Sequence, residues 1–253
     1  MRYLALACDY DGTLAHDGVV DEETVGWLER VRESGRHLLL VTGRELDQLL
    51  EVFPPLDIFD RVVAENGALL YRPATREETR LGEAPPEAFI QALRERDVPL
   101  SIGRSIVATV TPHEAAVLEV IRDLGLERQV IFNKGAVMVL PSGVNKASGL
   151  TCALDELKIQ AADVAGVGDA ENDHALLQLC GVGAAVANAL PSLKEHADLV
   201  LSKTHGAGVT ELIERILDGT LDETPRRPRT QTKRESARVH RLADKHADVH
   251  PNA

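Results

Sequence analysis

The most informative segment of this 253-residue chain is CDYDGTL, residues 8–14. It follows directly on an apolar run, residues 2–8, that predicts a buried β-strand. Side chains two residues apart can point the same way, so Asp9 and Asp11 can both face the crevice where open α/β sheets bind ligands. The Gly-Thr pair that comes next lets the chain turn and aim backbone N–H groups at an anion. An ordinary Asp-Gly turn after a strand is the alternative.

Apolar runs of strand length alternate with longer amphipathic stretches on both sides of a different middle segment. We expect strands at residues 2–8, 37–42, 61–64, 164–167, 182–186 and 199–201, and helices at 21–34, 45–52, 147–157, 171–179, just after 191 and at 209–217. This alternation is typical of a parallel sheet covered by helices. The sequence therefore predicts an α/β fold with a Rossmann-like parallel-sheet core, formed by residues 1–72 and 144–220.

The middle segment, residues 73–143, has another pattern, because prolines mark its start and its strands and helices do not alternate regularly. We expect helices at 87–96 and 113–124 and strands at 106–111, 130–132 and 136–140. This pattern predicts a small α+β insert that forms a cap over the active face of the core. Residues 221–253 hold eight Lys and Arg, five Asp and Glu, and few apolar residues, which predicts a basic, disordered tail. The sequence does not indicate a partner for this tail.

Composition excludes several classes of protein. The chain has 40 Asp and Glu against 28 Lys and Arg, a net charge of -12, which argues against nucleic-acid binding by the globular body and against anionic membranes. Cys8, Cys152 and Cys180 form no CxxC pair, so neither a disulfide framework nor a zinc site is predicted. The longest apolar stretch is interrupted by polar residues and is too short to span a bilayer. We expect a cytoplasmic protein.

Three further groups of polar residues lie at or beside predicted strand ends. Thr42 follows the second strand, so its hydroxyl is expected at the same sheet edge as Asp9; a helix cap or turn is the alternative. Lys146 supplies a positive charge where the chain returns from the insert, although lysines at helix starts are commonly solvated. Asp169 and Asp173 lie between a strand and a helix, where acidic residues also serve as helix caps. Their shared placement favours one site.

These residues resemble the motifs of the haloacid dehalogenase superfamily of phosphatases. The first motif, Asp-x-Asp-Gly-Thr, is matched at residues 9–13, the second at Thr42, the third at Lys146 and the fourth, Gly-Asp-x-x-Asn-Asp, at residues 168–173. The ENGA step at residues 65–68 is similar to the Cof-like, type IIB subgroup, whose cap is inserted between the second and third motifs. The insert is small for that subgroup and closer in size to that of archaeal phosphoglycolate phosphatases, trehalose-phosphate phosphatases and sucrose- or mannosylglycerate-type phosphatases.

The resemblance implies a Mg²⁺-dependent phosphatase acting on a small phosphate ester, either a sugar phosphate or a phosphoglycolate-like acid. Asp9 would be the nucleophile that forms an aspartyl-phosphate, and Asp11 would protonate the leaving alkoxide and then activate water. Mg²⁺ would be held by Asp9, the backbone carbonyl of Asp11, and Asp169, with Asp173 behind them or as an additional ligand.

Phosphoryl and substrate contacts are implied for the remaining motif residues. Thr42 and Lys146 would bind phosphoryl oxygens, and substrate contacts would come from Gly12, Thr13, Gly43, Arg44 and Asn66. Arg104, Asn133 and Lys134 of the insert are candidates for contacts with the leaving group, with simple solvation as the alternative. Two other functions stay open: a phosphomutase that uses the same nucleophile, and an accessory or regulatory domain of a larger assembly.

Overall fold

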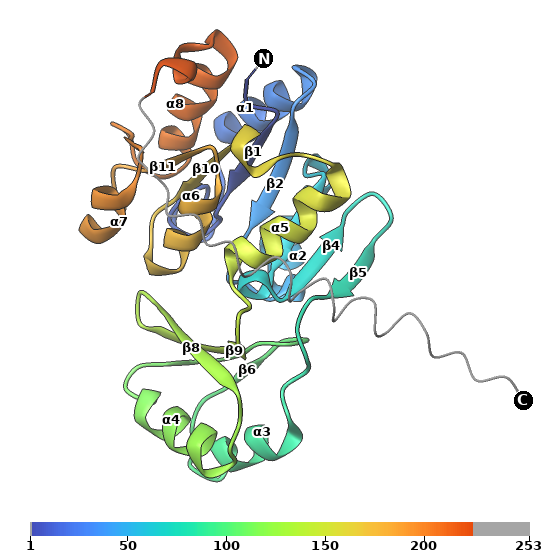
Figure 1. The fold of residues 1–253 in the computed structure, drawn as a ribbon, viewed down its shortest axis with the longest axis vertical. Helices are drawn as coiled ribbons and strands as arrows, with labels where there is room; N and C mark the ends of the chain where they lie inside the picture. The colour runs from blue at the N-terminus through green and yellow to red at the C-terminus, as the bar shows by residue number, and fades with distance from the viewer. Residues whose placement is uncertain (1, 225–253) are drawn as a thin grey trace, which may run out of the picture.

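The structure is a computed structural model that describes residues 2–224. Met1 and residues 225–253, which include most of the predicted basic tail, lie outside the described residues. The described chain forms a larger domain on an eight-stranded sheet and a smaller domain on a four-stranded sheet (Figure 1). The predicted fold class, an α/β core with an inserted α+β domain, is confirmed.

The strands of the core sheet are ordered β12-β11-β10-β1-β2-β3-β4-β5, and the first six in this order run parallel. These six strands are β1 (Ala5–Cys8), β2 (His37–Val41), β3 (Arg61–Ala64), β10 (Val164–Gly168), β11 (Val182–Ala185) and β12 (Leu199–Val200). All six correspond to predicted strands. Because β1 lies at the centre between β2 and β10, the residues that follow these three strands meet at one edge of the sheet.

An antiparallel pair, β4 (Leu69–Arg72) and β5 (Glu77–Arg80), extends the core sheet beyond β3. The sequence does not signal β5, because its residues EETR are charged and largely exposed. Residues 77–80 fall within the range predicted for the insert, 73–143. Their pairing with β4 nevertheless places them in the core sheet.

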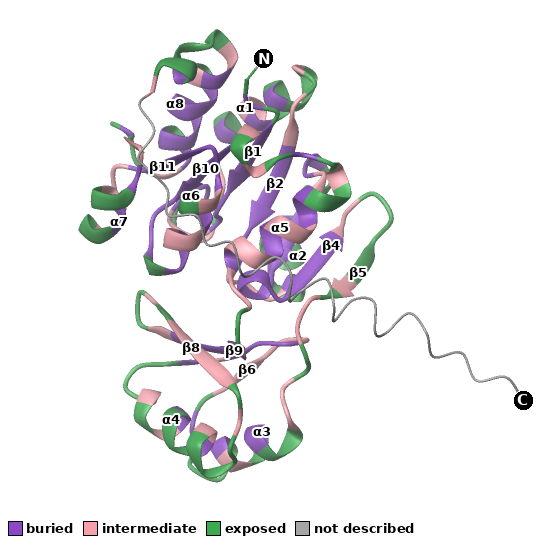
Figure 2. Cartoon of the chain, viewed as in Figure 1, coloured by how far each residue is buried: buried purple, intermediate pink, exposed green. Residues whose placement is uncertain are grey.

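The central strands are buried on both faces, which explains their nearly continuous apolar runs (Figure 2). Leu38 and Leu40 of β2 pack into one layer of the core, and Leu39 and Val41 pack into the other. The first layer is covered by α1 (Glu22–Glu33), α2 (Leu46–Val52), α7 (Pro191–His196) and α8 (His205–Asp218), and the second by α5 (Lys146–Leu157) and α6 (His174–Leu179).

A side-chain cap marks the start of α1, whereas α8 begins four residues before the predicted start. At α1, the Asp21 side chain accepts a hydrogen bond from the Thr24 N–H at 2.7 Å, as an N-cap does. At α8, glycines in the first turn lower the helix propensity of the sequence. The structure explains Gly206, because a Cβ there would overlap the Thr24 hydroxyl where α8 packs against α1.

The smaller domain is an antiparallel sheet of order β6-β7-β9-β8 with two helices on one face. Its elements are α3 (Glu87–Arg94), β6 (Ser101–Ile102), β7 (Val107–Val110), α4 (Glu114–Asp123), β8 (Arg128–Asn133) and β9 (Ala136–Pro141). It has its own apolar core, in which Phe89 and Leu93 of α3 pack against Val107 and Val139 of the sheet. Among the described residues, no helix combines the length and apolar character that a membrane crossing requires.

Candidate active site

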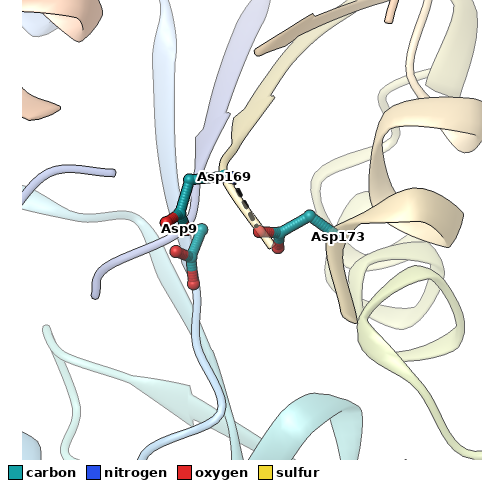
Figure 3. A group of neighbouring side chains, drawn as sticks. All are labelled: Asp9, Asp169 and Asp173. Atoms are coloured by element: carbon teal, nitrogen blue, oxygen red, sulfur yellow. Dashed lines mark hydrogen bonds between the residues drawn. The ribbon is translucent and has the colours of Figure 1, made fainter. Parts of the chain in front are cut away.

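Three carboxylates lie together at the carboxyl edge of the core sheet. Asp9 follows β1 and Asp169 follows β10, and these two strands are parallel neighbours. Asp173 lies in the 3-10 turn after Asp169 (Figure 3). Each of the three side chains is buried and offers an oxygen within 4.8 Å of the other two. The structure thus brings together Asp9, Asp169 and Asp173 of the predicted site.

Lys146 is the cation that joins this cluster from the core. Its ammonium lies 2.6 Å from Oδ1 of Asp9 and 2.6 Å from Oδ1 of Asp173, and the residue is only 1% exposed. Its position at the first residue of α5 is fixed by a capping box, in which Asn145 and Ser148 exchange hydrogen bonds of 3.0 and 2.9 Å. Burial alone would lower the pKa of Lys146, but attraction to Asp173 and Asp9 raises it above the ordinary value.

The three carboxylates of the cluster carry more negative charge than the two lysines paired with them, Lys134 and Lys146, can neutralise. Burial raises the pKa of Asp9 well above its usual value, and repulsion from Asp173 adds to the shift, although Lys146 opposes it. Burial also raises the pKa of Asp169, against the hydrogen bond from Lys134. A divalent cation that prefers oxygen ligands fits such a donor set, because it would neutralise carboxylates that are otherwise costly to ionise.

The carboxylate of Asp173 is occupied by the protein itself. Its Oδ2 accepts the backbone N–H groups of Asp169 at 3.0 Å and Ala170 at 3.1 Å, while Oδ1 bonds to Lys146. Asp173 therefore holds the loop that carries Asp169 in shape. Its use as an additional metal ligand stays a prediction.

Asp11 stands apart from the three-carboxylate cluster. Its side chain is 42% exposed, and both oxygens are held by the guanidinium fork of Arg44 at 2.6 Å each. Arg44 also lies over the ring of Tyr10, 5.3 Å from its centroid, and the Tyr10 hydroxyl donates to the Gly18 carbonyl at 2.9 Å. The Asp11 carboxylate is thus positioned at the entrance to the site, on the side of the second motif.

The loops around the cluster are close-packed, and two glycines are needed for that packing. Gly12 has φ +81°, and a Cβ there would overlap the Asp169 carboxylate. Its N–H donates to the Ala15 carbonyl at 3.0 Å, and its carbonyl accepts from the Asn188 side chain at 2.7 Å. Gly67, with φ +105°, would overlap the Asn145 carbonyl if it carried a Cβ. The absence of a side chain at Gly67 therefore lets the start of α5 lie close to the turn after β3.

The remaining residues predicted to contact the substrate differ in what they touch. The buried Thr13 hydroxyl donates to Asp169 Oδ1 at 3.2 Å, so this side chain supports the cluster. The Thr42 hydroxyl, also buried, accepts the Arg44 N–H at 3.1 Å and shapes the turn after β2. Gly43 lies beneath the insert, because a Cβ on it would be 3.5 Å from the Met138 sulfur.

Asn66 retains unused hydrogen-bonding capacity inside the protein. It has φ 54°, and its Oδ1 accepts from Asn172 Nδ2 at 3.0 Å. Asn66 Nδ2 and Asn172 Oδ1 are buried, and neither has a hydrogen-bond partner among the described residues. Buried polar atoms without partners are costly, so these two atoms are candidates to bind a substrate, a water or an ion. Asn172 belongs to the fourth motif but was missing from the predicted site.

Two further residues connect the insert to the core: Glu65, which was not predicted, and Lys134, which was predicted only as a candidate for contact with the leaving group. The carboxylate of Glu65 is fully buried and accepts the N–H groups of Arg104, Ser105 and Ile106 at 2.8, 2.8 and 3.2 Å. Lys134, in the β8–β9 turn, forms an ion pair with Asp169. The ENGA step drew attention to Asn66 rather than Glu65, and no local pattern connects Lys134 to the strand end that it meets.

The other two candidates from the insert differ in position. The Arg104 side chain forms ion pairs with Asp47 at 2.7 Å and Glu78 at 3.0 Å, so it connects the insert to α2 and β5. Asn133 precedes Lys134 in the turn, and its Oδ1 is buried without a partner among the described residues.

Comparison with known proteins assigns the chain to a protein family. A model of the haloacid dehalogenase-like hydrolases matches residues 6–114 and 117–213. The chain belongs to this family. The predicted resemblance and enzyme class, a phosphatase of the haloacid dehalogenase superfamily, are therefore confirmed. Use of a divalent metal is typical of this family, and the buried carboxylates could hold one.

Relatives support the family across nearly the whole chain. Phosphoglycolate phosphatase 2 of Saccharolobus solfataricus is 31% identical over 226 residues, which cover 85% of this chain and 93% of the relative. The phosphoglycolate phosphatase of Methanothermobacter thermautotrophicus is 31% identical over 229 residues, covering 84% and 98%. A haloacid dehalogenase-like hydrolase from Bacteroides thetaiotaomicron shares the fold with a TM-score of 0.71 at 20% identity, covering 85% of this chain and 99% of its own.

Proposed function

We propose that the protein is a Mg²⁺-dependent phosphatase that hydrolyses a small phosphorylated metabolite in the cytoplasm, through an aspartyl-phosphate on Asp9. The observation that carries the proposal is the buried Asp9 carboxylate, which Lys146 bridges to Asp173 beside Asp169. A buried nucleophile next to a fixed cation suits attack on a phosphoryl group, because the approach of two anions needs positive charge in a site of low dielectric.

The reaction takes two displacements. In the first, an Asp9 oxygen forms a bond to phosphorus and the bond from phosphorus to the ester oxygen breaks. Asp11, released from its pairing with Arg44 and protonated when the substrate binds, gives its proton to the leaving alkoxide. In the second, water gives a proton to Asp11 and bonds to phosphorus, and the bond to Asp9 breaks. Free phosphate is released and both aspartates return to their starting states.

The carboxylates are suited to a bound Mg²⁺. Asp9 and Asp169 would hold the ion together with the Asp11 backbone carbonyl, and when bound it would supply positive charge to the phosphoryl oxygens. Lys146 keeps Asp9 oriented, and Asp173 keeps the Asp169 loop in shape. The buried Nδ2 of Asn66 supplies a donor for a substrate oxygen.

A small substrate is favoured by the closeness of the insert to the core. Met138 of β9 reaches the Gly43 backbone, so a leaving group has little room above the second motif. The two relatives described above, each 31% identical to this chain, are phosphoglycolate phosphatases, which favours a small phosphorylated acid over a sugar phosphate.

Phosphate release from a panel of phosphate esters in the presence of Mg²⁺ tests the proposal. Asp9→Asn should lower kcat at least about 1,000-fold, since loss of a covalent nucleophile removes most of the rate enhancement. Asp17→Asn is the matched control, because Asp17 lies in the same loop but its side chain is 92% exposed. Full activity in Asp9→Asn contradicts the proposal, and an isomerised phosphate ester in place of free phosphate indicates a phosphomutase.

A further inference from the structure

Lys134 lies at the tip of the hairpin that joins β8 and β9. Asn133 and Ala136 pair across this turn, and the two residues between them have positive φ, 46° at Lys134 and 89° at Gly135. Positive φ is unfavourable for a residue with a side chain, so the turn holds Lys134 in a conformation that is disfavoured locally. The Lys134 N–H also donates to Glu171 at 3.3 Å, which fixes the turn against the fourth motif.

The side chain of this lysine enters the site from the insert. Its ammonium pairs with the fully buried Asp169 carboxylate, yet the side chain is 43% exposed. It also lies over the first motif, because a Cβ on Gly12 would be 2.8 Å from its nitrogen. The lysine therefore touches the carboxylate cluster while part of it faces the open side of the site.

The pairing with Asp169 conflicts with the proposed role of that carboxylate as a metal ligand. A cation held by Asp169 would compete with the ammonium, and the two positive charges would repel each other. Since a lysine side chain is long and flexible, Lys134 can turn away and bind another anion close by. Lys146 and Thr42 of the core are the residues expected to bind the phosphoryl group. An anion on the leaving group is therefore the partner expected for a cation that comes from the insert.

We propose that Lys134 is a specificity-determining residue that selects phosphate esters whose small leaving group carries a carboxylate, an inference that rests on the proposed phosphatase function. In the protein alone, Asp169 takes the place of that carboxylate. With metal and substrate bound, the ammonium pairs with the substrate carboxylate. Removing the charge then lowers the affinity for acidic esters more than for uncharged ones.

Two esters of similar size test this role: 2-phosphoglycolate, which carries the carboxylate, and 2-hydroxyethyl phosphate, which does not. The wild-type enzyme should prefer the acid in kcat/KM. Lys134→Met, which keeps the length of the side chain, should lower this preference by about 10- to 100-fold, mainly through KM, as expected for one charged hydrogen bond. Lys134→Arg should retain part of the preference. Arg122→Met is the control, because it removes an exposed cation of α4 that pairs with Asp123, and it should leave the preference unchanged.

Two binding measurements separate this role from catalysis. In an Asp9→Asn background, Lys134→Met should weaken calorimetric binding of 2-phosphoglycolate by at least about 10-fold, and it should strengthen Mn²⁺ binding because the competing ammonium is gone. A wild-type enzyme that hydrolyses both esters equally, or a Lys134→Met variant that keeps the preference or the affinity, overturns the role of Lys134 and leaves the phosphatase proposal intact. If the wild type hydrolyses no ester but the Asp9→Asn pair shows the expected loss of affinity, the phosphatase proposal fails and Lys134 remains the carboxylate-binding residue.

Discussion

The Glu65 carboxylate is expected to stabilise the contact between the insert and the core. It accepts three consecutive backbone N–H groups of the insert, those of residues 104–106, and it is fully buried. Glu65→Ala leaves all three donors without this partner. Two bonds of ordinary length at about 1.5 kcal/mol each, and a longer one at about half that, give an expected loss of about 4 kcal/mol in the free energy of unfolding.

Glu65→Gln gives an intermediate result. Its amide keeps one oxygen, which can accept from Ser105 and Ile106, while the NH₂ group faces the Arg104 N–H, so we expect a loss of about 2 kcal/mol. Glu119→Ala is the matched control, because Glu119 is an exposed residue of α4. It should change the free energy of unfolding by less than about 0.5 kcal/mol.

Urea denaturation measures the global loss, and hydrogen exchange of the amides of residues 104–106 measures the local one. These amides should exchange faster in Glu65→Ala than in the wild type, because their acceptor is gone. A loss below about 1 kcal/mol in Glu65→Ala, or unchanged exchange at these three amides, refutes the reasoning.

Two further predictions concern the charges of the site. Lys146→Met should lower kcat at least about 100-fold and destabilise the protein by about 3–5 kcal/mol at neutral pH, because it leaves two buried carboxylates without their cation. Phosphate release measures the first effect and urea denaturation the second. Lys158→Met, at the exposed end of α5, is the control. In EDTA, stability should rise as the pH is lowered from neutral, because the raised pKa values of Asp9 and Asp169 make the folded state bind protons more tightly than the unfolded state. Mg²⁺ at about 100 times its Kd should add about 2.7 kcal/mol at neutral pH, and Asp169→Asn should remove most of this gain; equal stabilisation of both proteins contradicts the metal site.

The core of the site could be predicted because the first, second and fourth motifs each directly follow a buried strand. An apolar run such as LALAC before Asp9 fixes a strand end, and parallel strands bring their carboxyl ends to the same edge. Asp9 and Asp169 are therefore placed by local sequence and simple topology. Lys146 was predicted from its position where the chain returns from the insert to the core. The capping box at the start of α5 then fixes where its backbone lies.

The contacts that were missed, those of Glu65 with the insert and of Lys134 with Asp169, join segments far apart in the chain. Glu65 binds amides about 40 residues away, and Lys134 reaches a carboxylate 35 residues away. No local periodicity encodes such contacts, because they depend on how the insert rests on the core. The edge strand β5 was missed for a different reason: its exposed EETR sequence lacks the apolar alternation that marks a half-buried strand.

The partners of the three buried carboxylates favour Asp9 as the proposed nucleophile. Asp173 is held by two backbone N–H groups and Lys146, and Asp169 is held by Thr13 and Lys134. Among the described residues, the Asp9 carboxylate accepts hydrogen bonds from the Lys146 side chain alone. Hydrogen bonds to a carboxylate stabilise its charge and reduce its tendency to attack, so the carboxylate with the fewest fixed partners is the best nucleophile. The same packing that secures Asp169 and Asp173 thus leaves Asp9 with the fewest fixed partners, as the proposed attack on a phosphoryl group requires.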